Sequence, residues 1–244
     1  METTVSAIVL RRTNSGETDR KLVLLTRELG KIEVTAKGAR KAASRLAGSS
    51  DPLTVAQMGL AVAKKNRFVT QAQPQTSFRG LRTDYDRLNM ALALCELYAA
   101  VLPWEEPLPE SFDLLLISLA RLEVHAKPPV ALIWAEIKLL ELSGFLPQFE
   151  RCVATDRPVS EANPFLSPHA GGYVSEQAAI EFTDRFRTRA EVLYGLARLS
   201  DLDEPPGNFK FVEEALADLL PFWRQIAETA LPANESAITE LRNT

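Results

Sequence analysis

The residues with the clearest chemical potential are four cations in the first fifth of the chain. Lys37, Arg40, Lys41 and Arg45 fall within nine residues of one another, around Gly38. Lysine and arginine on a flexible segment can meet a phosphate backbone at several points, and a glycine lets the main chain approach a phosphate closely. The spacing therefore predicts a phosphate-binding surface. The alternative is a solvated loop that has no ligand.

Further cations lie near the ends of the strands expected in the same region, and we include them in the predicted DNA-binding set: Arg11, Arg12, Arg20, Lys64 and Lys65. Residues 1–80 carry a net charge of +8, whereas residues 81–244 carry −12. A concentrated positive surface attracts polyanions by counterion release, largely without reading base sequence. The charge distribution therefore favours nucleic-acid binding, although such cations can also simply solvate a small β domain.

A second basic group lies in the acidic part of the chain. Arg185 and Arg189 are four residues apart, so they would share one face of the helix that we expect over residues 177–199. There they would give one molecule a second DNA contact. The alternative is that they pair with the acidic residues close by, Glu181, Asp184, Glu191 and Asp201.

Residues for catalysis or metal binding are scarce. The sequence has no Walker loop, no dinucleotide-binding glycine pattern and no His-Glu-x-x-His motif. Its two histidines, His125 and His169, stand apart from any pattern of a nucleophile or a charge relay. Cys95 and Cys152 cannot build a tetrahedral thiolate site by themselves. We expect no catalytic residue, no cofactor and no metal ion.

Aromatic residues that could stack on bases are also few in the basic part of the chain. Residues 1–80 hold no tryptophan or tyrosine, and their only phenylalanines are Phe68 and Phe78. We therefore expect DNA binding that is dominated by phosphates, tolerant of base sequence and strongly dependent on salt. The three tryptophans lie on or beside expected helices and are interpreted as core residues: Trp104, Trp134 and Trp223.

A β-rich module must position the first basic group. The seven residues from Lys31 onward alternate strictly, with Ile32, Val34 and Ala36 on one face and Lys31 on the other. Four more segments have the length and composition of strands: residues 5–10, 22–26, 53–63 and 68–72. Five short strands in about 75 residues predict a small closed barrel, because closure removes exposed sheet edges. Residues 38–50 lack this alternation and are interpreted as a mobile loop on the barrel rim.

After residue 80 the hydrophobic spacing becomes helical. We expect five helices. The first begins near Asp84, the second begins at Glu110 or Ser111, and the other three cover residues 130–142, 177–199 and 209–229. We expect them to pack as a bundle, with the last dozen residues frayed. Residues 147–175 have no periodicity, which indicates either a functional segment or an embedded small subdomain.

The chain has no segment typical of membrane proteins. Its longest apolar stretches are far shorter than the roughly 20 residues that a membrane-spanning helix needs. The apolar run near the N-terminus is too short for a signal peptide, and two cysteines cannot form a disulfide framework. We expect a cytoplasmic α+β protein of more than one domain that does not contact a membrane.

Several segments, read in order, resemble the RecO family of bacterial recombination-mediator proteins: residues 7–12 (AIVLRR), 16–20 (GETDR), 25–31 (LTRELGK), 36–41 (AKGARK) with Ser44-Arg45, and 142–147 (LSGFLP). Each segment alone is a weak signal, and their order and spacing carry the resemblance. It extends over most of the chain. It implies an N-terminal OB-fold over residues 1–80, a helical domain over residues 81–147 and 176–244, and a zinc-finger-like insert over residues 148–175.

The resemblance also implies a function without enzymatic turnover. Proteins of this family bind single- and double-stranded DNA and anneal complementary strands. With RecR they help to load RecA onto single strands coated by single-strand binding protein, in recombinational repair. Their helical domain takes up the acidic C-terminal tail of single-strand binding protein. A nucleoid-associated protein in the bacterial cytoplasm is expected on this basis.

The insert departs from the family pattern. Many members carry two Cys-x-x-Cys pairs there, which would hold zinc with four thiolates. This chain keeps Cys152 and has Ser175 and Ala178 in place of the later pair. His169 and Asp156 lie nearby as conceivable substitutes, yet we expect a subdomain that folds without metal. Its expected supports are the prolines and three aromatic residues, Phe149, Phe165 and Tyr173.

Two other functions fit parts of the sequence. The alternative to DNA binding is a non-catalytic scaffold whose basic barrel binds an acidic partner protein. A hydrolase acting on nucleic acid would need clustered carboxylates and a metal ion. The six acidic residues within residues 1–80 are mostly interleaved with basic ones, which argues against such a site.

Overall fold

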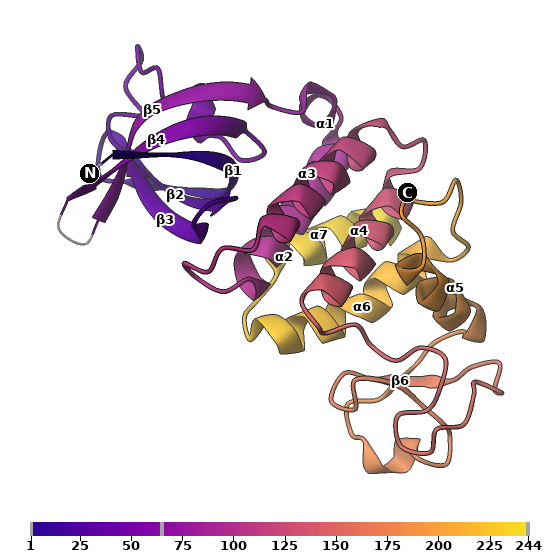
Figure 1. Cartoon of the computed structure of the whole chain (residues 1–244). Helices are drawn as coiled ribbons and strands as arrows, with labels where there is room; N and C mark the ends of the chain where they lie inside the picture. The colour runs from indigo at the N-terminus through magenta and orange to yellow at the C-terminus, as the bar shows by residue number, and fades with distance from the viewer. Residues whose placement is uncertain (1, 64–65, 243–244) are drawn as a thin grey trace. The chain divides into compact units, whose positions relative to one another are not determined.

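The computed structural model describes residues 2–63 and 66–242 (Figure 1). It has two compact units, of which one ends at Glu123 and the other begins at Val124. The first unit holds a β-barrel and three helices, so the helical part of the chain is divided between the units. The α+β layout, with a barrel ahead of the helices, is the one that the sequence predicted. The three-module limits given above stay a prediction.

Five strands close into an OB-like barrel: β1 (Glu2–Ser15), β2 (Asp19–Thr26), β3 (Gly30–Ala36), β4 (Val55–Ala63) and β5 (Asn66–Thr76). Their order around the barrel is β1-β2-β3-β5-β4, and the predicted closed barrel is thereby confirmed. Neighbouring antiparallel strands pair over seven or more residues each. Strands β3 and β5 instead meet in parallel at Thr35 and Phe68, which makes this seam the shortest ladder of the barrel.

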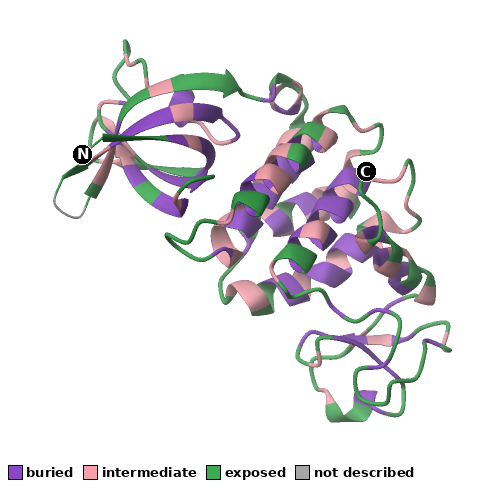
Figure 2. Cartoon of the chain, viewed as in Figure 1, coloured by how far each residue is buried: buried purple, intermediate pink, exposed green. Residues whose placement is uncertain are grey.

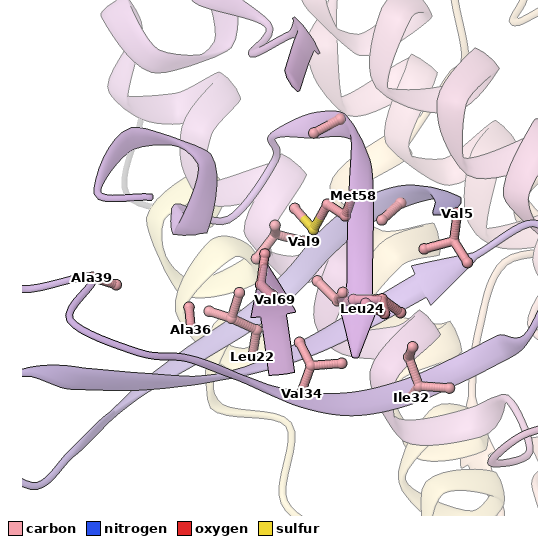
Figure 3. Packing of buried hydrophobic residues seen from close by; sticks show 13 residues of the cluster. Val5, Val9, Leu22, Leu24, Ile32, Val34, Ala36, Ala39, Met58 and Val69 are labelled. Atoms are coloured by element: carbon pink, nitrogen blue, oxygen red, sulfur yellow. The ribbon is translucent and has the colours of Figure 1, made fainter. Parts of the chain in front are cut away.

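Alternate residues of the strands fill the barrel interior (Figure 3). Ile32, Val34 and Ala36 lie inside on β3, and Leu22 and Leu24 do the same on β2. All five are at most 2% exposed. Removing the larger of these side chains from water contributes about 1.5–3 kcal/mol each, so the alternation in the sequence fixes which face of each strand turns inward.

Three helices complete the first unit: α1 (Arg79–Thr83), α2 (Tyr85–Val101) and α3 (Pro109–Val124). Asp84 caps α2 by accepting a hydrogen bond from the backbone N–H of Arg87, as its place before the helical spacing predicted. Lys31 Nζ donates to the carbonyl of Ala99, near the end of α2, over 2.7 Å. Lys31 is therefore buried. It lies on the face of β3 opposite Ile32, as the alternation predicted, and the end of α2 buries it there.

The second unit contains α4 (Pro128–Leu142), α5 (Ala190–Ser200), α6 (Val212–Ala227) and α7 (Pro232–Arg242). Helix α4 is buried over most of its surface and packs against α5 and α6 (Figure 2). The helix expected from residue 177 begins only at Ala190, because residues 179–187 contain a 3₁₀ turn and a short strand. The expected fraying of the last dozen residues is wrong for residues 233–242, since α7 packs against α6 and buries Ala237, and residues 243–244 lie outside the described part of the chain.

A small sheet lies between α4 and α5, in the order β7-β6-β8, formed by β6 (Phe165–Ser167), β7 (Gly172–Val174) and β8 (Phe186–Arg187). Phe149 and Tyr173 are buried in this insert, and the Tyr173 hydroxyl donates to Glu161 over 2.7 Å. Phe165 is half-buried, with the Arg187 guanidinium 4.3 Å from its ring centroid. The expected aromatic support of the insert is confirmed.

None of the helices in the described part of the chain is both long and apolar enough to cross a membrane.

Candidate nucleic-acid interface

Three of the predicted cations gather at one end of the barrel, where the chain leaves β3. The backbone N–H of Arg40 donates to the carbonyl of Thr18 over 2.9 Å, and Arg40 Nη1 donates to the carbonyl of Gly16 over 2.9 Å. These bonds fix the turn after β3 against the turn between β1 and β2. Lys37, Arg40 and Lys41 are all exposed on this turn, which we call the basic end of the barrel.

Asp19 orders the basic end. Its carboxylate accepts a 2.8 Å hydrogen bond from the backbone N–H of Gly38, whose φ of +65° favours glycine. The bond from Gly38, a second one from Thr18 and the charges of Lys37 and Lys41 lower the pKa of Asp19. One ionised carboxylate therefore faces two lysines, and a surplus of positive charge remains for an anionic ligand.

The connection after β3 is packed onto the barrel. Ala39 is fully buried, and Leu46 packs against the barrel core. Arg20 reaches this connection from β2, where its Nη1 donates to the carbonyl of Ala47 over 2.9 Å and to Ser50 Oγ over 2.6 Å. Because the Arg20 side chain is only 16% exposed, its main role in this structure is to brace the connection.

The other predicted cations of the first unit are less concentrated. Arg12 forms an ion pair with Asp51. Arg11 is exposed on β1, and its charge adds to burial in lowering the pKa of Lys31 to about 8. Arg45 is exposed on the connection after β3. Two further cations lie outside the described residues, Lys64 and Lys65.

Arg185 and Arg189 do not share a helix face, so that part of the prediction is wrong. Arg185 precedes β8, and its Nη1 donates to the carbonyl of Phe182 over 2.7 Å. Arg189 is the residue before α5 and pairs with Glu214 of α6 over 2.8 Å. Sequence spacing could not indicate this partner, because it comes from another helix. Both arginines are exposed, and their contact with DNA stays a prediction.

The aromatic residues divide into core and surface. Trp134 and Trp223 are buried, as predicted. Trp104 is 52% exposed, so its interpretation as a core residue is wrong. The reason is that Trp104 lies in the loop after α2, where its main chain forms a β-bridge with Lys31 of the barrel. Residues 1–80 contain two phenylalanines. Phe78 is buried, and the ring centroid of Phe68 lies 4.1 Å from Lys37 Nζ.

The insert does not fit a zinc ion. Cys152 Sγ accepts a hydrogen bond from the backbone N–H of Ser175 over 3.2 Å. Burial raises the pKa of the Cys152 thiol, but hydrogen bonds with Thr155 and Ser175 lower it more, to about 7. Asp156 is engaged in an exposed ion pair, and His169 is exposed. Within residues 2–63 and 66–242, no three or more Cys, His, Asp or Glu side chains gather in a way that could hold a metal ion.

Comparison with protein families places the chain. Residues 1–78 match the recombination protein O N-terminal family, and residues 82–235 match the recombination protein O C-terminal family. The chain belongs to the RecO family. The resemblance seen in the sequence is thereby confirmed, and the two RecO matches meet at α1, between the barrel and α2.

Curated members of the RecO family are similar over most of the chain. The DNA repair protein RecO of Roseiflexus sp. (strain RS-1) is 36% identical over 173 residues, which are 71% of this chain and 61% of that protein. The protein of the same name from Heliobacterium modesticaldum is 38% identical over 69% of this chain and 62% of its own length. That of Gloeobacter violaceus is 31% identical over 83% of this chain and 78% of its own length. The matched part spans about three fifths of the first two proteins.

Proposed function

We propose that this chain is a DNA-binding mediator of DNA repair and recombination that acts without enzymatic turnover. It binds single- and double-stranded DNA through the sugar–phosphate backbone and promotes the pairing of complementary strands. The observation that carries the proposal is the basic end of the barrel, with Lys37, Arg40 and Lys41 on an ordered turn. Membership of the RecO family and the name of its relatives, DNA repair protein RecO, support the role.

The chemistry of the basic end suits backbone binding. The ammonium groups of Lys37 and Lys41 and the guanidinium of Arg40 are donors without acceptor capacity, so phosphate oxygens are their natural ligands. Each phosphate that they neutralise releases counterions, which steepens the dependence of affinity on salt by about 0.7 per contact for single strands. Base edges are left available to a complementary strand, and annealing requires this.

A charge-reversal experiment tests the proposal. Lys37→Glu/Lys41→Glu changes the basic end, and Arg157→Glu/Lys210→Glu makes the same change of net charge elsewhere in the chain. Binding of a fluorescent oligo-dT is measured by anisotropy over a range of salt concentrations. The first double variant is expected to bind more weakly, with a log–log salt slope shallower by about 1.4, and to anneal complementary strands more slowly. The second is expected to behave close to wild type.

Two results would contradict the proposal. An equal loss in both double variants would mean that net charge alone matters, not the basic end. Retention of an acidic protein, with no binding of DNA by the wild type at physiological salt, would favour the scaffold alternative instead.

The partner proteins are part of the same proposal. RecR is the expected co-mediator, RecA is loaded indirectly, and single-strand binding protein is contacted through its acidic tail. For that tail we propose the groove between α6 and α7. The groove has a volume of about 300 Å³ and joins the apolar residues Leu220, Pro221 and Ile238 to Arg224 and Arg242.

An acidic tail needs an apolar pocket with a cation beside it, and this groove supplies both. Arg224 is paired with Glu235 over 2.7 Å, so a carboxylate of the tail would compete with Glu235 for the guanidinium. Calorimetry with a synthetic tail peptide tests the groove. Arg242→Glu is expected to abolish binding, whereas Arg198→Glu on α5 is expected to leave it intact. Binding that survives Arg242→Glu would remove the groove from the proposal.

A further inference from the structure

The loop between α2 and α3 places an aromatic side chain on the barrel surface. Trp104 forms a parallel β-bridge with Lys31, and the backbone N–H of Glu105 donates to the Lys31 carbonyl over 2.9 Å. The loop also lies against Gly30, where an added Cβ would be 1.9 Å from the carbonyl oxygen of Glu106. The position of Trp104 is therefore set by main-chain contacts, independently of its side chain.

The indole of Trp104 is supported, yet it remains open to solvent. Lys31 Nζ lies 4.5 Å from the ring centroid and is itself held by the carbonyl of Ala99. Trp104 is nevertheless 52% exposed. A rigid indole that presents its surface to water, with a cation against it, has the properties of a stacking platform and not those of a core residue.

A hollow adjoins the indole on the barrel side. It has a volume of about 460 Å³, and its walls include Thr35 of β3, Asn66 and Arg67 of β5, and Trp104. Lys31 does not line it, so the supporting cation and the hollow meet different parts of the indole. Small-ligand sites begin at about 300 Å³, so there is room for one flat heterocycle beside Trp104.

The charges in the hollow are balanced within the protein. Arg67 pairs with Glu105 over 2.5 Å, and Glu33 pairs with Lys21 over 3.1 Å. A phosphate gains little from a surface whose cation is already engaged by a carboxylate. An uncharged ring needs no counter-charge there, so the face of a nucleobase suits this surface better than a phosphate does.

The hollow and the basic end lie along one strand. Thr35 lines the hollow, and Lys37 follows two residues later, about 7 Å away at the rise of an extended chain. Lys37 in turn lies over Phe68, which pairs with Thr35 at the β3–β5 seam. A strand of DNA held at Lys37 by its phosphates would thus have a base within reach of the Trp104 hollow.

We propose that Trp104 and the adjoining hollow bind a nucleobase of single-stranded DNA by stacking, beside the phosphate contacts at the basic end. This inference rests on the proposed function, because it adds a base contact to backbone binding. It differs from the expectation of binding by phosphates alone, which considered only residues 1–80, whereas Trp104 lies outside them. Stacking does not read base identity, so tolerance of sequence is retained.

Comparison of two oligonucleotides of equal length and charge tests the inference. One is oligo-dT, and the other has abasic sites in place of the thymidines. Wild type is expected to bind oligo-dT more tightly, and Trp104→Ala is expected to reduce that preference by about five- to a hundredfold, with the salt slope unchanged. Trp104→Phe is expected to keep part of it. Phe145→Ala, which removes another aromatic side chain of 52% exposure, is the control and is expected to keep all of it.

Intrinsic fluorescence gives an independent readout. Trp134 and Trp223 are only 2% and 1% exposed, so oligo-dT is expected to quench Trp104 above all, and quenching is expected to disappear in Trp104→Phe. A preference for oligo-dT that is the same in wild type and Trp104→Ala would overturn the inference and leave the proposed function standing. Absence of binding to both oligonucleotides would overturn both. Quenching by a partner protein but not by oligo-dT would reassign the hollow to a protein contact.

Discussion

Replacing Glu136 by glutamine is expected to flatten the pH dependence of unfolding of the second unit. Glu136 lies on α4 and is only 3% exposed, and its carboxylate accepts a 2.8 Å hydrogen bond from Trp223 Nε1 on α6. Burial raises the pKa of Glu136 to about 8, although the bond from Trp223 acts in the opposite direction. The carboxyl is therefore mostly protonated in the folded protein at neutral pH.

The size of the effect follows from the two protonation states. In the unfolded chain Glu136 titrates near its ordinary value of 4.5. Between these two pKa values the folded protein holds a proton that the unfolded chain has released, so the free energy of unfolding falls as pH rises. Each pH unit is worth up to about 1.4 kcal/mol, and the wild type loses on the order of 3 kcal/mol between pH 5 and pH 8 from this group.

Urea unfolding followed by circular dichroism at pH 5, 6.5 and 8 measures the difference. The glutamine amide in Glu136→Gln does not titrate, and its oxygen can still accept the bond from Trp223. The free energy of unfolding of the variant is therefore expected to match that of wild type at pH 5 and to exceed it at pH 8. Glu141→Gln, an exposed change on the same helix, is the control and is expected to follow wild type. The free energy of unfolding still falls with pH in the wild type and in both variants, because burial also raises the pKa of Asp218 to about 7. Parallel curves for wild type and Glu136→Gln would refute the reasoning.

Three further outcomes are expected. Gly30→Ala should destabilise the first unit by on the order of 3 kcal/mol in thermal unfolding, because φ is +69° and the new Cβ would overlap the main chain of Glu106; a loss under about 1 kcal/mol would contradict this. Arg20→Met removes the bonds to Ala47 and Ser50 and should speed hydrogen exchange in the connection after β3, and unchanged exchange would argue against the brace. Elemental analysis of the purified protein should find far less than one zinc per chain, and stoichiometric zinc whose removal lowers the melting temperature would overturn the metal-free insert.

The barrel and the first helices were predictable because their core contacts recur at regular spacing. Alternation marked Ile32 and Val34 as inward residues, and both are buried. Asp84 and Pro103 delimit α2 by local chemistry, one as an N-cap and the other as a residue that cannot continue a helix. Such signals need no knowledge of distant parts of the chain.

The failures share a different cause, which is contact between distant segments. Ile180 and Phe186 fit the helical spacing expected from residue 177, but Ile180 is 78% exposed and Phe186 pairs with Leu166 in a sheet. The exposure of Trp104 was missed because its main chain pairs with Lys31, about 70 residues earlier in the chain, and no local spacing indicates that contact. The basic end was predictable in composition, whereas its order depends on Asp19 and on the β1–β2 turn, which no local pattern indicates.

The bond from the Glu105 amide to the Lys31 carbonyl means that the loop between α2 and α3 covers part of the barrel. A protein truncated at residue 80 would lack that loop, and the Lys31 ammonium would lose the Ala99 carbonyl as its hydrogen-bond acceptor. The Lys31 carbonyl on its third strand would then lack the Glu105 amide, and an extended segment of another chain can supply such a donor. We therefore expect a fragment that includes the loop with Trp104 to be more stable than one that ends at residue 80.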